Sequence, residues 1–225
     1  MINKKKIFIA IDTNKVSKAK KIIRDTQTNK IKIGYKFGLE FFYSKNGRRF
    51  LSGLKNQIIF LDLKLNDIPN TVSSAMKSLK NLKIAYLTVH LSSGLNALKA
   101  VKKESKNIKI AGVTTLTSLN NKDLKDIGYN KKVNELVRHQ ASLATKAKLD
   151  AIICSGHEVR SVKRVFKKEI ITPGIKMQNI KNDQKRIMGP ADAFAIGSNW
   201  LVIGRSITNG NIKKNIKNLL EILED

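Results

Sequence analysis

The feature that most constrains the fold is an alternation that runs along the whole chain. Short apolar runs rich in isoleucine and valine alternate with longer segments in which apolar residues recur with a period near 3.6. The runs that we expect to form strands are 7–12, 31–34, 58–63, 86–90, 108–114, 151–154, 170–172 and 201–203. The helical period is clearest in 71–82, 133–148 and 212–223. This alternation predicts parallel strands joined by right-handed helical crossovers.

Repeated eight times within 225 residues, the pattern predicts an α/β fold, a single (β/α)8 TIM barrel that takes up residues 1–225 as one domain. An open, doubly wound sheet is the alternative. The first run is followed by Asp12-Thr13-Asn14, where a dinucleotide-binding sheet would carry a glycine-rich turn. In a barrel, the chemistry is expected at the C-terminal ends of the strands.

The formal net charge of +27 raises the question of a nucleic-acid partner. The lysines are scattered over the whole chain and form no single arm or stripe, and the chain is also rich in asparagine and isoleucine. A general bias toward these residue types explains the charge, so we expect no specific nucleic-acid partner. A basic surface still helps to collect an anionic substrate at low salt.

The sequence also indicates the cellular compartment in which the protein is expected. No apolar run approaches the roughly 18 residues that cross a bilayer, so we expect no membrane association. The apolar stretch after Lys4-Lys5-Lys6 is too short for a signal peptide. Cys154 is the single cysteine, which fits a reducing cytoplasm, and its apolar surroundings predict a buried, inert thiol.

Charged residues gather at the end of the third predicted strand. Asp62, Lys64 and Asn66 are two residues apart and therefore share one face of a strand. One interpretation is an inward-facing lysine that needs carboxylates as partners, because an unpaired buried cation is costly. The other is a surface ion pair followed by Asp67 as a helix N-cap before Pro69. The residues alone leave both open.

This stretch resembles the hallmark of orotidine 5'-phosphate decarboxylases, an Asp-x-Lys-x-x-Asp-Ile-Pro-Asn-Thr run with every defining position present. Further blocks resemble the same family in the same order. They are Ala10-Ile11-Asp12, Ile31-Lys32-Ile33-Gly34, Thr88-Val89-His90, Val113-Thr114-Thr115-Leu116-Thr117-Ser118, Thr172-Pro173-Gly174-Ile175, Asp183-Gln184-x-Arg186-Ile187-Met188 and Val202-Ile203-Gly204-Arg205. The resemblance implies a barrel that converts orotidine 5'-monophosphate to UMP and CO2 without cofactor or metal.

The resemblance also implies roles for the charged residues. Lys64 stabilises the carbanion formed at C6 of the pyrimidine and then protonates it. Asp62 lies near the departing carboxylate, and Lys32 and Asp67 complete an alternating charge network with these two. Asp12 and Lys32 contact the ribose hydroxyls.

Other positions are expected to bind substrate. Thr117 and Ser118 match family positions that face the pyrimidine. The segment 67–71, with Ile68 and Thr71, matches one that reaches the neighbouring subunit's site, which implies a homodimer with shared active sites. His90 is expected to be a supporting hydrogen-bonding residue.

The phosphate is expected at Gly204 and Arg205, because barrels commonly hold phosphate after strands 7 and 8. The loop after Gly174 resembles the segment that closes over the phosphate, with Gln184 as its contact. Here the chain departs from the family: Lys176 stands where bacterial members usually have arginine, and the loop is one residue shorter. Gln178 is therefore the alternative to Gln184.

Two rival functions remain. A sugar-phosphate enzyme of the same suprafamily, such as a 3-keto-gulonate 6-phosphate decarboxylase or a hexulose-phosphate synthase, shares the Asp-x-Lys-x-x-Asp core but uses Mg2+, with an acidic residue where Lys32 stands. Lys32 and Ile68-Pro69-Asn70-Thr71 count against it. The second rival is a nucleic-acid-binding protein driven by the positive charge.

Overall fold

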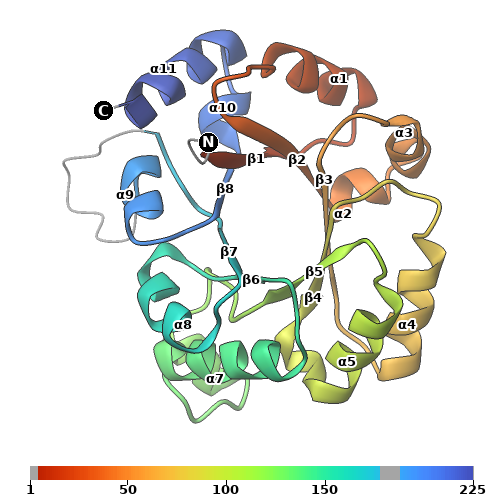
Figure 1. Ribbon diagram of the computed structural model, residues 1–225, viewed down its shortest axis with the longest axis vertical. Coiled ribbons are helices and arrows are strands. Elements are labelled where there is room, and N and C mark those ends of the chain that lie inside the picture. Colours follow the sequence, from red (N-terminus) through yellow and green to blue (C-terminus); the bar gives the residue numbers. More distant parts are fainter. Residues whose placement is uncertain (1–4, 178–187, 225) are drawn as a thin grey trace.

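The computed structural model describes residues 5–177 and 188–224. In it, eight parallel strands close into a barrel in the order β1 to β8, and helices surround them (Figure 1). The strands are β1 (Lys6–Ile11), β2 (Lys32–Gly38), β3 (Ile59–Leu65), β4 (Tyr86–His90), β5 (Lys109–Val113), β6 (Ala151–Ile153), β7 (Glu169–Thr172) and β8 (Trp200–Ile203). Pairing of β1 with β8 closes the sheet and rules out the open, doubly wound alternative.

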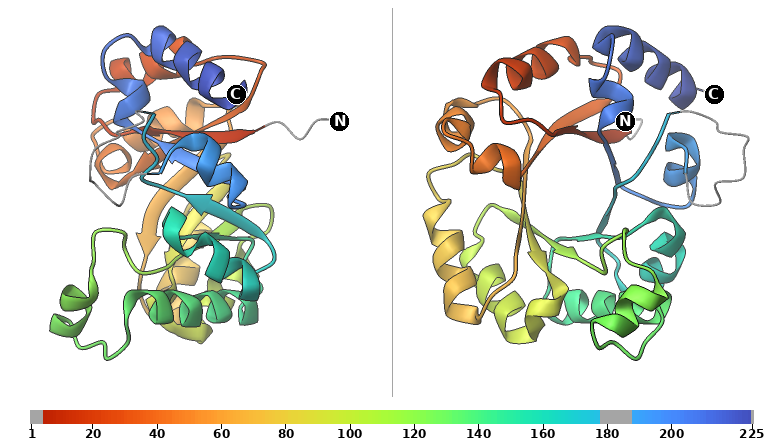
Figure 2. Two further views of the ribbon diagram at one scale, coloured as in Figure 1. Left: turned by 90° about the vertical axis from the view of Figure 1, so that its left-hand side faces the viewer. Right: turned by 180° about the vertical axis from the view of Figure 1, so that it is seen from behind.

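The described helices cover the outside of the barrel. They are α1 (Val16–Asp25), α2 (Leu39–Phe42), α3 (Gly47–Gly53), α4 (Pro69–Ser78), α5 (Gly94–Glu104), α6 (Asn121–Asp126), α7 (Val133–Lys146), α8 (Val159–Val165), α9 (Pro190–Ala195), α10 (Arg205–Thr208) and α11 (Ile212–Glu224), with 3-10 turns η1 (Leu91–Ser93) and η2 (Gly156–Glu158). The short helix α6 stands out from the body of the barrel in the left view of Figure 2.

Alternation along the strands separates two apolar layers. Ile7, Ile9 and Ile11 of β1 are fully buried beneath the helices, in the larger core cluster. Phe8 points into the barrel, where its ring stacks on Trp200 with centroids 4.0 Å apart. The interior is therefore packed with side chains rather than hollow, as expected for a barrel of eight strands.

The predicted barrel is confirmed, and the three clearest helical segments form α4, α7 and α11. The second strand is the main correction, because it was expected to end at Gly34 and instead continues to Gly38. Gly34 lies opposite Phe8 in the register, and a Cβ there would sit 2.6 Å from the Phe8 ring and 2.9 Å from the carbonyl oxygen of Ile58. Glycine at this position permits close packing of β2 against the chain on either side of it and does not end the strand.

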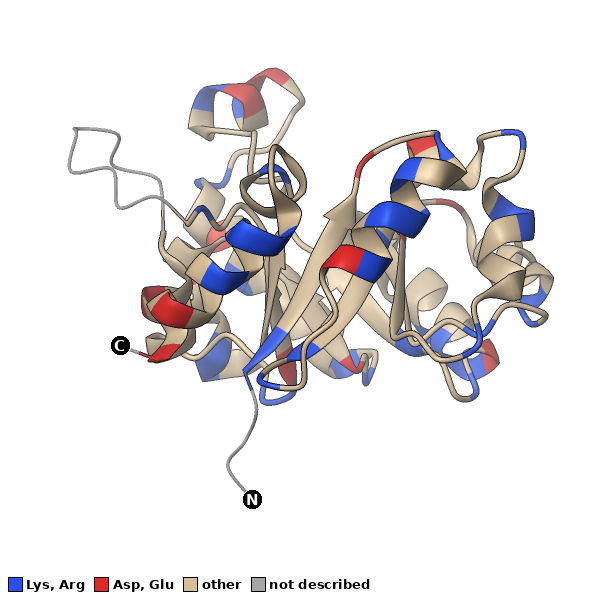
Figure 3. Ribbon diagram, turned by 90° about the horizontal axis from the view of Figure 1, so that it is seen from above, with Lys and Arg blue, Asp and Glu red and all other residues tan. Residues whose placement is uncertain are grey.

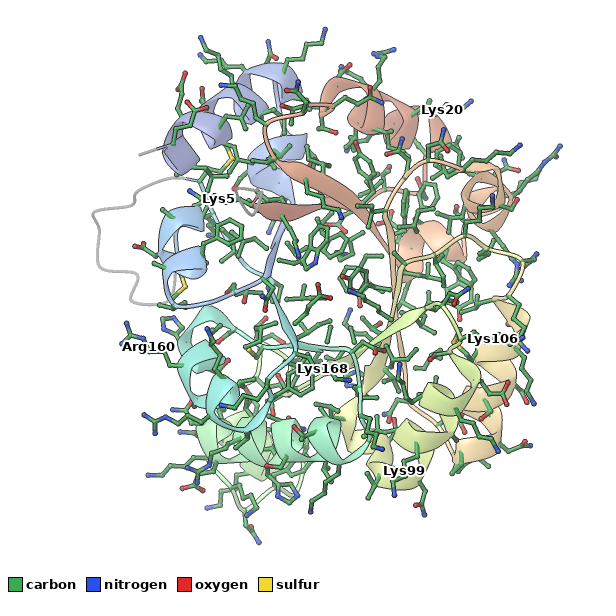
Figure 4. All side chains as sticks on the ribbon, in the orientation of Figure 1. Lys5, Lys20, Lys99, Lys106, Arg160 and Lys168 are labelled. Carbon is green, nitrogen blue, oxygen red and sulfur yellow. The ribbon has the colours of Figure 1, made fainter. Side chains whose placement is uncertain are left out.

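Basic residues are spread over many of the helices and loops seen in Figure 3 and do not gather on one element. Lys20, Lys99 and Arg160 come from three different helices and point outward in Figure 4. In the described part of the chain, no helix is long and apolar enough to cross a membrane.

Candidate active site

Four charged residues form a continuous network at the C-terminal ends of β1, β2 and β3, and we call it the mouth network: Asp12, Lys36, Asp62 and Lys64. Nζ of Lys64 lies 2.8 Å from Oδ2 of Asp62. Nζ of Lys36 lies 3.5 Å from the same oxygen and 3.5 Å from Oδ1 of Asp12. Positive and negative charges alternate along the mouth network, and its formal charges sum to zero. Each charge that is withdrawn from bulk water therefore lies beside a charge of opposite sign.

Exposure within the mouth network increases toward its two ends. The side chains of Asp62 and Lys36 are 11% and 14% exposed, whereas those of Lys64 and Asp12 are 34% and 60% exposed. The charged groups of Asp62 and Lys36 are thus largely buried in the barrel, whereas those of Lys64 and Asp12 remain accessible to a substrate. This arrangement favours the interpretation of Asp62 and Lys64 as an inward-facing pair over a plain surface ion pair.

The backbone at Lys64 is unusual. Its φ of 49° lies in the left-handed region, which non-glycine residues rarely adopt. The β3–β4 register also shifts between Leu61 and Leu65. The strand therefore bulges where the charged side chains of Asp62 and Lys64 leave it, a feature that often occurs beside active sites.

The expectation for Lys32 is wrong in its placement. Lys32 is the first residue of β2, lies beside Lys6 at the N-terminal end of the barrel and is exposed. Lys36, four residues and roughly 13 Å further along the strand, lies between Asp12 and Asp62 instead. Lys-x-Gly stands both at 32–34 and, directly after it, at 36–38, and the copy at 36–38 could have pointed to Lys36.

The segment after β3 lies away from the network in the single chain. Asp67 is exposed, its Oδ1 accepts a hydrogen bond from the backbone N–H of Ile68, and it forms no ion pair with a described residue. The residue before α4 is Ile68, so Asp67 is not the helix N-cap. Ile68 is 66% exposed, and Thr71 is exposed as well.

A cavity of about 690 Å3 lies at the ends of β5, β6 and β7. Thr117 lines it, together with Pro173 and Gly174, whereas the exposed Ser118 is not part of its wall. The mouth network does not line this cavity, so the two features occupy different sectors of the same end of the barrel.

The predicted phosphate residues follow β8. Gly204 precedes α10, and Arg205, the first residue of that helix, is exposed. A Cβ on Gly204 would lie 3.6 Å from Oδ2 of Asp12, so this turn adjoins the mouth network. Lys176 is exposed, and its backbone N–H donates to the carbonyl of Met188. Gln178 and Gln184 lie outside the described residues.

Two further residues adjoin the mouth network. Burial lowers the pKa of half-buried His90, and the nearby charge of Lys64 lowers it further, while Asp62 opposes the shift. Thr88, for which the sequence alone predicted no role, is fully buried and hydrogen-bonds both Asp62 and the backbone N–H of Lys64.

The single cysteine, Cys154, is buried, and burial raises the pKa of its thiol, in keeping with an inert group.

Comparison with known proteins agrees with this geometry. The model of the "Orotidine 5'-phosphate decarboxylase / HUMPS family" matches residues 5–216. The orotidine 5'-phosphate decarboxylase of Sphingopyxis alaskensis is 39% identical over 209 residues, which cover 91% of this chain and 92% of the relative. That of Coxiella burnetii is 37% identical over 216 residues, 90% of this chain and 89% of the relative. The crystal structure of orotidine 5'-phosphate decarboxylase from Lactobacillus acidophilus superposes with a TM-score of 0.81 at 26% identity, covering 98% of this chain and 100% of that one. The chain belongs to the orotidine 5'-phosphate decarboxylase / HUMPS family.

Proposed function

We propose that this chain decarboxylates orotidine 5'-monophosphate to UMP and CO2, and that it does so in the cytoplasm. The observation that carries the proposal is the mouth network, in which the Lys64 ammonium is held 2.8 Å from Asp62 at the end of a barrel strand. The relatives that match nine tenths of the chain are orotidine 5'-phosphate decarboxylases. The single thiol, Cys154, is buried and suits a reducing compartment.

The reaction at C6 needs charge stabilisation and one proton. The bond from C6 to the carboxylate carbon breaks, CO2 leaves, and the electron pair remains on C6. Lys64 places its positive charge beside this pair and then transfers a proton to it, which forms the C6–H bond of UMP. The neutral amine regains a proton from water, and the cycle closes without a net change in the protein.

The stabilisation is electrostatic and in place before the bond breaks. Two unit charges at about 4 Å attract each other by roughly 4 kcal/mol at an effective dielectric near 20. Because Asp62 and Lys36 already hold Lys64 in an ordered network, little reorganisation is needed during the reaction. Asp62 lies where the substrate carboxylate is expected, and departure of CO2 removes the repulsion between these two anions.

The rest of the substrate is expected to span the mouth. Asp12 and Lys36 adjoin each other and are proposed to contact the ribose hydroxyls, so that Lys36 takes the role first expected of Lys32. The phosphate is proposed to bind at Gly204 and Arg205, with the guanidinium offering two parallel donors. Thr117 and Ser118 are proposed to face the pyrimidine from the β5 side.

We further propose that the active unit is a homodimer with shared active sites. Three large apolar side chains, Leu39, Tyr43 and Ile68, are exposed on the segments that follow the neighbouring strands β2 and β3. Exposed apolar residues in one region favour a protein interface. Asp67, beside Ile68, has no ion-pair partner among the described residues, so it is free to serve a site across that interface.

Mixing two inactive variants tests the shared sites. If Asp67 acts across the interface, Lys64→Ala and Asp67→Ala dimers that exchange subunits regain about a quarter of wild-type activity, because each mixed two-fold dimer has one intact site. If Asp67 acts within its own chain, the mixture stays inactive. Native mass spectrometry of the mixture checks that exchange has occurred.

The activity is tested by following the ultraviolet absorbance of orotidine 5'-monophosphate in the presence of a chelator. We expect conversion to UMP by the wild type and a loss of at least about 1000-fold in Lys64→Ala, which lacks both the charge and the proton donor. Circular dichroism checks that the variant is folded. Turnover of a sugar phosphate that needs Mg2+, with none of orotidine 5'-monophosphate, would instead establish the sugar-phosphate rival.

A further inference from the structure

The bulge in β3 leaves one side chain of β4 in an unusual place. Leu61 pairs with Leu87 and Leu65 pairs with Val89, so three residues of β3 (62–64) face the single residue Thr88. A bulge of this kind interrupts the regular ladder of backbone hydrogen bonds. The backbone N–H of Lys64 then donates to a side chain, the hydroxyl of Thr88, at 2.6 Å.

The chemistry of the partners determines how the Thr88 hydroxyl is oriented. The backbone N–H of Lys64 can only donate, so Oγ1 of Thr88 accepts there through a lone pair. The hydroxyl hydrogen is thereby left for Oδ1 of Asp62, which lies 3.1 Å away and can only accept when ionised. One fully buried hydroxyl therefore joins the backbone of one charged residue to the carboxylate of the other.

The two contacts act on the same ion pair from opposite sides. Oδ1 of Asp62 is held by Thr88, which orients the other oxygen, Oδ2, toward Nζ of Lys64. The left-handed backbone of Lys64, with φ of 49°, carries a conformational cost and persists only where its surroundings hold it. Thr88 supplies one of the contacts that hold it.

We propose that Thr88 is a positioning residue: its hydroxyl sets the bulged backbone of Lys64 and the rotation of the Asp62 carboxylate together, and so places the ammonium for the decarboxylation. The part of this inference that concerns catalysis rests on the proposed function. The geometric part, that Thr88 holds the Lys64 amide, stands independently of it. Thr88 itself contacts no reacting atom.

The test compares Thr88→Val, which removes the hydroxyl at nearly constant volume, with Thr88→Ser, which keeps it. We expect kcat of Thr88→Val to fall about 10- to 100-fold while KM changes less than about threefold, because positioning acts on the reaction step more than on binding. Thr88→Ser is expected to stay within about threefold of the wild type for the same reason. Equal kcat values for wild type and Thr88→Val would overturn the proposal.

A matched control separates positioning from the general effect of losing a buried hydroxyl. Thr26 is also fully buried, and its hydroxyl bonds to the carbonyl of Ile22 and to Oη of Tyr35, at the end of α1 and away from the mouth network. We expect Thr26→Val to lower stability and leave kcat unchanged. If Thr26→Val and Thr88→Val lower kcat equally, the effect is general and the proposal fails.

A second measurement does not depend on activity. Amide hydrogen exchange at Lys64, followed by NMR, is expected to be slow in the wild type and in Thr88→Ser and to become at least about tenfold faster in Thr88→Val. Unchanged exchange would overturn the proposal even in a protein with no decarboxylase activity. If Thr88→Val does not fold, Thr88→Cys takes its place, because a thiol is only a weak hydrogen-bond donor. A kcat and a Lys64 amide exchange rate equal to those of the wild type in Thr88→Cys would likewise contradict the proposal.

Discussion

Charged residues occur at both ends of the barrel, and the two groups differ in how the backbone holds them. At the N-terminal end lies what we call the floor cluster: Lys6, Tyr86, Lys109 and Glu169, which are the first residues of β1, β4, β5 and β7. At the other end lies the mouth network. Both contain lysines paired with carboxylates at the ends of the barrel strands, so residue type alone does not distinguish them.

The floor cluster converges on one carboxylate. Glu169 accepts from Nζ of Lys109 at 2.8 Å and from Oη of Tyr86 at 2.7 Å, and Nζ of Lys6 lies 3.7 Å from it. Burial opposes ionisation of Glu169, but the hydrogen bonds and charges of its partners outweigh it and hold the pKa below its ordinary value. None of these four residues has a positive φ.

The mouth network has the opposite character. Positive and negative side chains alternate along it, and the carboxylate at its outer end, that of Asp12, is largely exposed. Lys64 has a left-handed backbone in a bulged strand. Strain of this kind is characteristic of sites that act on a ligand. The difference supports the proposal that the floor cluster stabilises the barrel, whereas the mouth network carries the chemistry, in agreement with the general division of labour in TIM barrels.

The largest expected effect separates two lysines of one strand. Lys36→Ala removes the cation between Asp12 and Asp62, and we expect kcat/KM to fall about 100- to 1000-fold. Lys32→Ala removes a lysine at the floor end, and we expect less than about a threefold change. Steady-state kinetics on both variants measures this difference. Equal losses, or a larger loss for Lys32→Ala, would contradict the assignment of Lys36.

A smaller effect, on stability, is expected at the floor cluster. Glu169→Gln removes the charge that Lys6 and Lys109 share, and we expect the free energy of unfolding to fall by about 1–2 kcal/mol with kcat unchanged. The matched control is Glu221→Gln, because Glu221 is exposed and pairs only at 4.0 Å with Lys217. That variant is expected to change stability by less than about 0.5 kcal/mol. Urea unfolding measures the free energy of unfolding of both variants. A loss of activity in folded Glu169→Gln would contradict the purely stabilising role of the floor cluster.

Acid should remove the contribution of Glu169. Because its pKa is lowered from an ordinary value of 4.5, the stabilisation is complete above that pH and is lost as the pH falls through the folded-state pKa. The stability difference between wild type and Glu169→Gln is therefore expected to be constant near neutral pH and to shrink below pH 4.5. A difference that grows in acid would show that the sign is wrong.

The smallest effect concerns His90 at the mouth. Its pKa is lowered from 6.5, first by burial and then by the charge of Lys64. We expect an NMR titration to give a midpoint below 6.5, and Lys64→Ala to move that midpoint upward while leaving the burial effect in place. Neutral His90 thus adds stability above pH 6.5 that is lost on acidification. An unchanged midpoint in Lys64→Ala would place the two groups too far apart to interact.

Local features of the chain were predicted well from its sequence. The alternation of apolar runs and helical periods indicated the barrel, and the spacing of Asp62 and Lys64 indicated one shared strand face, because both depend on residues close together in the chain. Whether that face points inward was left open by the residues alone. The cation of β2 was misplaced because the resemblance was matched to Ile31-Lys32-Ile33-Gly34 and the strand was expected to end at Gly34. That glycine is required by the ring of Phe8 on the neighbouring strand, a contact that no local pattern reveals.

By itself, then, the sequence determined the order of strands and helices, the charged end of β3 and the Gly204-Arg205 turn after β8. Only the tertiary structure decided that Lys36 rather than Lys32 lies beside Asp62, and that Thr88 joins Asp62 to the backbone of Lys64. The reason is physical. Periodicity follows from the geometry of one segment, whereas contacts between strands depend on their register, which side-chain packing across the closed barrel sets.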